Sequence, residues 1–150
     1  MEPFFLHFPE ISEKETRAVV LSAGQHGLPP DQYIFLEYYC MNPECDCRSV
    51  LLEVINSKGE HLASISHSLE KTGFWAAGGK QSFLDRHNKQ GHYAKALLKF
   101  FIVHLMNADY ARDIERHLLL MRKKIKKGCL PGFNIIGIKN ALAAFFRRWC

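Results

Sequence analysis

The sequence has no long hydrophobic run. Nowhere in its 150 residues do about 18 consecutive apolar side chains occur, the length that marks a candidate membrane-spanning helix. The first residues, Met1 to Glu10, carry neither a positively charged start nor an extended apolar stretch, so we expect no secretory signal. From these two absences we expect a soluble, cytoplasmic protein whose length suits one compact core.

Fingerprints of common enzyme classes are also missing. The sequence has no G-x-S-x-G motif, no H-E-x-x-H motif and no glycine-rich dinucleotide fingerprint. Residues 73–82 approach a phosphate-binding loop, but Lys80 falls one position late and Gln81 stands where Ser or Thr should follow. No small-molecule substrate is identifiable from the sequence, which favours a role other than catalysis.

Acidic side chains are absent from the last part of the chain. Residues 121–150 hold eight Lys and Arg and no Asp or Glu, whereas the other 120 residues hold twelve basic and fifteen acidic side chains. We therefore expect a domain over residues 1–128 and a basic, amphipathic, helical segment over residues 129–150. This segment either packs back on the domain or contacts a partner, which would be a protein groove, an anionic membrane or nucleic acid.

Cysteine is present in an unusual arrangement. Three of the five cysteines, Cys40, Cys45 and Cys47, follow a C-x4-C-x-C spacing within eight residues. An odd number of cysteines without an export signal argues against a disulfide scaffold. Three soft sulfur donors at one turn offer most of the tetrahedral shell of a zinc ion, so we predict a zinc site. Packed thiols or a redox pair are the alternatives.

Hydrophobic periodicity predicts an α+β fold. We expect a three- or four-stranded antiparallel meander packed by C-terminal helices, with the cysteines at a zinc-stapled hairpin turn. The three clearest strands are residues 33–39, 49–55 and 61–67; a helical turn at Ser12 runs into a further strand candidate, residues 16–22. The expected helices are residues 93–106 and 110–127.

One histidine is placed to complete the metal shell. The second helix has a buried stripe that contains His117, together with Tyr110, Ile114, Leu118, Met121 and Ile125. An imidazole on an apolar face needs a partner, and zinc bound by the three cysteines would provide one. The alternatives are a core histidine bonded to a backbone carbonyl, or a fourth ligand from His92, His67, Cys129 or water.

The cysteine turn also carries a family pattern, Tyr39-Cys40, Pro43 and Cys45-Asp46-Cys47-Arg48. With it the chain resembles a family of small, mostly bacterial proteins of uncharacterised function that share a Y-C-x-x-P-x-C-D-C-R core. Further matches are Leu84-Asp85, Tyr93-Ala94, Leu97-Leu98 and Arg116-His117. The resemblance implies a metal-binding domain with Cys40, Cys45, Cys47 and His117 as ligands, and it implies no activity. The part after Lys127 does not match.

These observations lead to one functional expectation and one rival. We expect a small zinc-binding protein whose metal is structural and which acts as a binding or adaptor module, with a protein partner at the C-terminal segment. The rival is a metalloenzyme or a thiol-based redox enzyme that uses the cysteine cluster. A deaminase-like zinc enzyme is disfavoured because the spacing P-C-x-x-C is absent.

Overall fold

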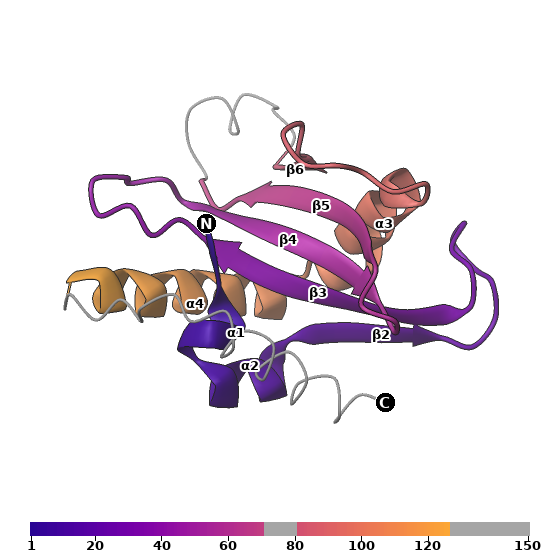
Figure 1. The fold of residues 1–150 in the computed structure, drawn as a ribbon, viewed down its shortest axis with the longest axis horizontal. Helices are drawn as coiled ribbons and strands as arrows, with labels where there is room; N and C mark the ends of the chain where they lie inside the picture. Colours follow the sequence, from indigo (N-terminus) through magenta and orange to yellow (C-terminus); the bar gives the residue numbers. More distant parts are fainter. Residues whose placement is uncertain (71–80, 127–150) are drawn as a thin grey trace.

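The computed structural model describes residues 1–70 and 81–126 (Figure 1). Its elements are β1 (Glu2–Pro3), α1 (Phe4–His7), α2 (Pro9–Glu15), β2 (Arg17–Leu21), β3 (Asp31–Tyr39), β4 (Ser49–Asn56), β5 (His61–Ser68), β6 (Ser82–Leu84), α3 (Ala94–Phe100), η1 (Phe101–Leu105) and α4 (Ala108–Lys126). The segment expected over residues 129–150 and most of the near-miss phosphate loop lie outside the described residues.

The strands form one antiparallel sheet. Their order is β1-β3-β4-β5-β6, and β2 also pairs with β3. This confirms the α+β class and the expected meander, which is β3, β4 and β5. Within the described residues the sheet has six strands rather than three or four. The additional strands β1 and β6 have two and three residues, too few for an alternating pattern to show in the sequence.

Side chains alternate along β3 between two faces of the sheet. Tyr33, Phe35 and Tyr39 belong to the core that the sheet shares with α3, η1 and α4, whereas Ile34 and Leu36 belong to a smaller apolar cluster with Phe5 of α1. Glu37 falls in register with the first set, so a carboxylate points toward the helices. It is buried there.

The helical part begins after β6. The helix expected over residues 93–106 is realised as α3 followed by a single π-helical turn, η1, in which the N–H of Met106 reaches the carbonyl of Phe101. Asn107 then caps α4, because its Oδ1 accepts hydrogen bonds from the N–H groups of Asp109 and Tyr110 at 3.1 and 2.9 Å. The separation of the two expected helices, residues 93–106 and 110–127, is therefore confirmed.

The helical turn expected at Ser12 is present as part of α2. Ser12 lies inside α2 and is buried, whereas Phe8 occupies the N-cap position and Pro9 the first helical position. The N–H of the first helical residue has no acceptor within the helix, so a proline, which has no N–H, loses no hydrogen bond there. Ser12 is therefore an interior residue of α2 and does not cap it.

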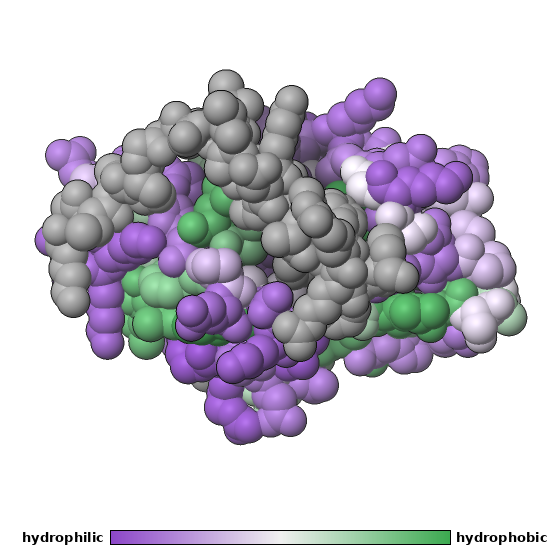
Figure 2. Space-filling view, turned by 60° about the horizontal axis from the view of Figure 1, so that its bottom comes forward, coloured by the Kyte–Doolittle hydropathy of each residue, from purple (hydrophilic) through white to green (hydrophobic). Residues whose placement is uncertain are grey.

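The described surface is mixed in polarity. Viewed from the side of α1, α2 and β2, apolar patches alternate with polar side chains (Figure 2). Val20 on β2 is 71% exposed and Leu119 on α4 is 52% exposed. In the described part of the chain, no helix combines the length and the apolar character that crossing a membrane requires.

Candidate metal centre

The three cysteines lie on the loop that joins β3 to β4. Cys40 directly follows the last residue of β3, and Cys47 precedes the first residue of β4 by two positions. Between them a turn closes where Cys45 N–H donates to the carbonyl of Asn42, whose side-chain oxygen accepts from the N–H of Glu44 at 3.0 Å. This turn brings the distant ends of the cysteine pattern together.

The geometry of the three sulfurs suits a metal ion. The Sγ atoms of Cys40, Cys45 and Cys47 all lie within 4.8 Å of one another, and each cysteine is partly buried and free. Thiolates bound at about 2.3 Å in a tetrahedral zinc shell stand about 3.8 Å apart. The distances between the Sγ atoms would therefore have to shorten by at most about one ångström to bind the ion. The loop can adjust by this amount because it makes few contacts with the strands.

The thiols have unequal surroundings. The N–H of Cys47 donates to Cys45 Sγ at 3.4 Å, and this bond, with the neighbouring thiols, lowers the pKa of Cys45. Burial, together with the neighbouring thiols of Cys45 and Cys40, raises the pKa of Cys47 to about 12. Three adjacent thiolates repel one another. All three would ionise together only if a cation bound at their centre offset this repulsion.

The cysteine loop is attached to α4 by two arginines. Arg122 on α4 donates to the carbonyl oxygen of Cys47 at 2.6 Å, and Arg48 in the loop forms an ion pair with Glu115. An open cavity of about 370 Å³ lies between loop and helix. It is lined by Cys40, Asn42, Pro43, Cys45, Leu119, Arg122, Lys123, Ile125 and Lys126. The cysteines thus face the C-terminal half of α4.

The structure brings together three of the four predicted ligands. His117 does not belong to the group of close ligand atoms formed by the cysteines. The positions of the two residues on α4 explain this. Leu119 lines the cysteine cavity. It is two positions after His117, and two positions correspond to a rotation of about 200° around an α-helix. His117 belongs to a different stripe of α4, with Ile114 and Met121, and this stripe packs on the sheet.

His117 is engaged by two carboxylates instead. Its Nδ1 lies 2.7 Å from Oε2 of Glu37 and its Nε2 lies 2.8 Å from Oε2 of Glu15. A carboxylate only accepts hydrogen bonds, and a neutral imidazole has one N–H, so both bonds form together only when His117 is protonated. The predicted role of His117 as a metal ligand therefore has no support from this geometry, since neither ring nitrogen offers a free lone pair.

The charge state of His117 follows from the balance of two effects. Burial disfavours the imidazolium, but the hydrogen bonds and charges of Glu37 and Glu15 outweigh burial and raise the pKa of His117. Burial likewise opposes ionisation of Glu15, and hydrogen bonds from His117 and Arg116 outweigh it, so its pKa is lowered. The ring of Phe4 stacks on the imidazole at 4.1 Å between centroids.

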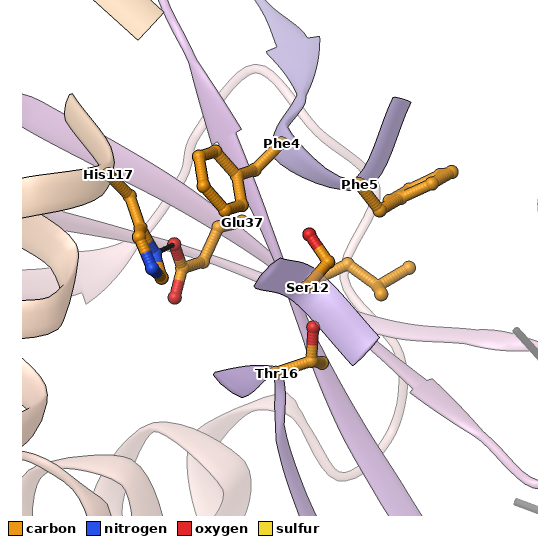
Figure 3. Close-up of a pocket in the computed structure, with 7 residues that line it drawn as sticks. Phe4, Phe5, Ser12, Thr16, Glu37 and His117 are labelled. Atoms are coloured by element: carbon orange, nitrogen blue, oxygen red, sulfur yellow. Dashed lines mark hydrogen bonds and ion pairs between the residues drawn. The ribbon is translucent and has the colours of Figure 1, made fainter. Parts of the chain in front are cut away.

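Figure 3 shows His117 facing Glu37 beside a small cavity under α1 and α2. The cavity has a volume of about 10 Å³, and its lining includes Ser12 and Thr16. Such a volume holds about one water and excludes a substrate. His117, whose side chain is 1% exposed, therefore holds three elements together, α2, β3 and α4, and does not form an active site.

A second buried histidine, His67, lies beside a serine and a cavity. His67 Nδ1 lies 2.8 Å from Ser82 Oγ, near a cavity of about 460 Å³ that His67 helps to line. Burial lowers the pKa of His67 to about 4, which makes it a weak base at neutral pH. Ser82 is buried and is not among the residues that line this cavity, so the pair is a buried hydrogen bond between β5 and β6.

Comparisons with known proteins do not assign this chain to a family. Searches against protein families, curated proteins and solved structures found no match. The resemblance to small bacterial proteins with a shared cysteine core therefore remains a prediction from the sequence, based on the cysteine turn and on the shorter matches downstream of it.

Two residues that the structure makes important are not identified from the sequence: Glu37, which pairs with His117, and Arg122, which bonds to the cysteine loop. Glu37 was detectable, because a carboxylate inside the aromatic strand 33–39 falls on the inward side of the alternation. Arg122 was not, because it looks like any member of the basic run at the end of α4. The contact of Arg122 with the Cys47 carbonyl depends on how α4 packs against the sheet and the cysteine loop.

Proposed function

We propose that this chain is a small zinc-binding module in which Cys40, Cys45 and Cys47 hold one structural zinc ion. The observation that carries the proposal is the convergence of three sulfur atoms within 4.8 Å on a loop that is attached to α4. A bound ion would link the end of β3, the start of β4 and, through Arg122, the helix. Sulfur-rich sites of this kind commonly stabilise a fold.

Metal analysis of the purified full-length chain tests the proposal. We expect one zinc per chain, retained through gel filtration, and its loss in Cys45→Ser. The matched control is Cys150→Ser, which changes a cysteine outside the triplet and should keep the metal. A wild-type protein that folds fully, holds no metal and gains no stability from added zinc would refute the proposal.

A thiol-based enzyme is the second candidate, and one observation favours it. The cavity of about 370 Å³ opens on Cys40 and Cys45, and the pKa of Cys45 is lowered by its hydrogen bond from the N–H of Cys47. This candidate predicts rapid alkylation of Cys45 at neutral pH in the protein as isolated. The structural-zinc proposal predicts protection of the same thiol until a chelator is added.

The adaptor role rests on the basic segment after residue 128. We propose a protein partner there, because the amphipathic pattern of residues 133–149 suits a hydrophobic groove whose rim is acidic. Truncation after Leu130 tests this: partner binding should be lost while zinc content and thermal unfolding stay unchanged. Binding of the segment to anionic vesicles or to nucleic acid, without a protein partner, would overturn this part.

A further inference from the structure

Two exposed histidines lie side by side at the end of the sheet away from the cysteine loop. His26 belongs to the loop between β2 and β3, and His104 belongs to η1. Their ring centroids are 4.4 Å apart, and the ring planes are tilted by 53°. Figure 1 shows the β2–β3 loop and α3 at one end of the sheet and the cysteine loop between β3 and β4 at the other. The pair is therefore separate from the proposed zinc centre.

The backbone holds both histidines in constrained positions. Gln25 and Leu28 exchange two backbone hydrogen bonds of 3.1 and 2.9 Å, and the two residues between them, His26 and Gly27, have φ values of 55° and 76°. Positive φ at both central residues is typical of a type I′ turn, the tightest hairpin connection. His104 lies in the π-helical turn η1. Neither imidazole is therefore carried by a long, freely moving loop.

Both imidazole rings pack against the same core side chain. The ring centroid of Phe100 lies 5.4 Å from that of His26 and 4.9 Å from that of His104. Phe100 is 7% exposed and belongs to the main core. The loop itself lies against α3, since a Cβ built on Gly27 would be 3.6 Å from the Cβ of Ala96. The fold thus brings the two rings together before any ligand binds, which lowers the cost of binding.

The ring nitrogens of this pair are available to a ligand. His117 and His67 use ring nitrogens in hydrogen bonds to carboxylates and to a serine. By contrast, neither His26 nor His104 forms a hydrogen bond or an ion pair with another residue of the described ranges. A neutral imidazole with an unused nitrogen is a good ligand for a transition metal.

The spacing of the rings fits two neighbouring ligands of one metal ion. With metal–nitrogen bonds of about 2.1 Å and each nitrogen about 1.1 Å from its ring centre, two imidazoles at 90° have centroids about 4.5 Å apart. A tetrahedral angle would require about 5.2 Å. The observed 4.4 Å matches the first arrangement. That arrangement is found in the tetragonal complexes of Ni²⁺ and Cu²⁺.

We propose that His26 and His104 form an exchangeable surface site for a divalent transition-metal ion of the Ni²⁺ and Cu²⁺ class, with water in the remaining positions. The site goes beyond the proposed zinc function and does not depend on it. A bound ion would join the β2–β3 loop to η1, in addition to their shared packing on Phe100. Two imidazoles hold an ion less tightly than three thiolates do, so this ion is lost in gel filtration.

Calorimetric titration of the zinc-loaded, full-length chain with Ni²⁺ at pH 8 tests the proposal, because metal ions bind the neutral imidazole. We expect one Ni²⁺ per chain beyond the zinc. His26→Asn should weaken this binding about tenfold or more, because it removes one of two linked ligands. Asparagine tolerates the positive φ of the turn, so the loop is kept. His104→Gln should give the same loss.

The matched control is His87→Gln, which removes a histidine whose side chain is 95% exposed and lies outside the pair. It should leave the Ni²⁺ affinity unchanged. Equal affinities of wild type, His26→Asn and His104→Gln would overturn the proposal.

Paramagnetic broadening by Ni²⁺ identifies the ligands directly. Substoichiometric Ni²⁺ should broaden the imidazole proton signals of His26 and His104 together and leave those of His87 sharp. Broadening of one member of the pair without the other would show a contact with a single histidine, and the proposed site would be wrong.

This proposal and the zinc proposal fail in different ways. Ni²⁺ bound by the cysteines gives sulfur-to-metal charge-transfer absorption, which two imidazoles cannot produce. Ni²⁺ that binds only with this absorption, and equally well in His104→Gln, would refute the histidine site. A chain that takes up no zinc, but binds Ni²⁺ without this absorption and loses it in His104→Gln, would refute the zinc function and support the histidine site.

Discussion

At the scale of single residues, the most constrained group is the carboxylate of Glu37. Its side chain is 5% exposed, and one oxygen, Oε2, accepts hydrogen bonds from Tyr39 at 2.7 Å and from His117 at 2.7 Å. A buried carboxylate is costly unless it is paired and hydrogen-bonded. His117 supplies both the charge and the donor, so the pair belongs to the folding energetics of the protein.

Replacing His117 by Gln tests this. Gln keeps a donor but removes the cation, so Glu37 is left as a buried charge, and we expect a loss of about 3 kcal/mol in the free energy of unfolding. Urea denaturation followed by circular dichroism measures it. The control is Arg112→Ala, which breaks an exposed ion pair with Asp109 on the same helix and should cost at most about 0.5 kcal/mol. If the two variants lost the same free energy of unfolding, His117 would not act as the cation that compensates buried Glu37.

The same residue predicts a pH dependence. Because the pKa of His117 is raised, its stabilisation is complete below pH 6.5 and is lost as the pH rises through its folded-state pKa. Because the pKa of Glu15 is lowered, its contribution is complete above pH 4.5 and is lost as the pH falls through its folded-state pKa. The window between pH 4.5 and 6.5 should therefore show the largest effect.

The measurement is the difference in unfolding free energy between wild type and His117→Gln across pH 3 to 9. Taking a difference cancels the pH dependence of metal binding, which both proteins share. A difference that stays constant with pH would show that His117 is not protonated between the two carboxylates.

At the scale of elements, α4 serves two separate contacts on two of its faces. One stripe, with Ile114 and His117, packs on the sheet; the other, with Leu119 and Arg122, faces the cysteine loop. The loop from Cys40 to Arg48 has no strand pairing of its own. Apart from the hydrogen bond that the Arg48 carbonyl accepts from the N–H of Leu69, its position depends on α4 and, as proposed, on zinc.

Arg122→Ala should loosen the loop. The lost bond to the Cys47 carbonyl has a charged donor, and such bonds contribute about 1.5 kcal/mol or more, so we expect zinc to bind about tenfold more weakly. Competition with a chromophoric chelator measures the affinity. Lys123→Ala is the matched control, because it removes a cation from the same cavity lining without removing the bond to Cys47. If both variants bound zinc equally more weakly than wild type, the loss of a cation, and not the loss of the bond to Cys47, would explain the weaker binding.

The start of α4 offers a prediction that does not involve the metal. Asn107→Ala removes the side-chain acceptor for two N–H groups of the first turn, which should lower the free energy of unfolding by about 1 kcal/mol. Asn107→Asp should retain most of the stability, because aspartate caps as well. Thermal unfolding at constant pH distinguishes the variants, and an alanine variant as stable as wild type would contradict the capping role.

At the scale of the whole molecule, stability comes from two sources. The first is the apolar core between the sheet and α3, η1 and α4, which includes Phe35, Leu52 and Phe101, all fully buried. The second is the proposed metal clasp at the edge of that core. The core does not need the cysteine side chains, so the two sources are separable.

Chelation should separate them. We expect the metal-free protein to keep its far-UV circular dichroism, to unfold at a lower temperature, and to exchange amide hydrogens faster in residues 40–48 and at the C-terminal end of α4. Added zinc should reverse all three changes. Complete loss of secondary structure on chelation would instead show that the sheet depends on the metal.

The sequence by itself determined the local features of this protein. Alternation predicted β3, β4 and β5, periodicity predicted the helices, and the C-x4-C-x-C spacing predicted that three sulfurs meet, because all of these depend on residues near one another in the chain. The pairing of His117 with Glu37, 80 residues earlier, depends instead on how α4 rotates against the sheet. A helix stripe shows which residues are buried, but not which buried partner each one meets. That choice, between the cysteine loop and the carboxylates, is made by long-range packing, and only the tertiary structure contains it.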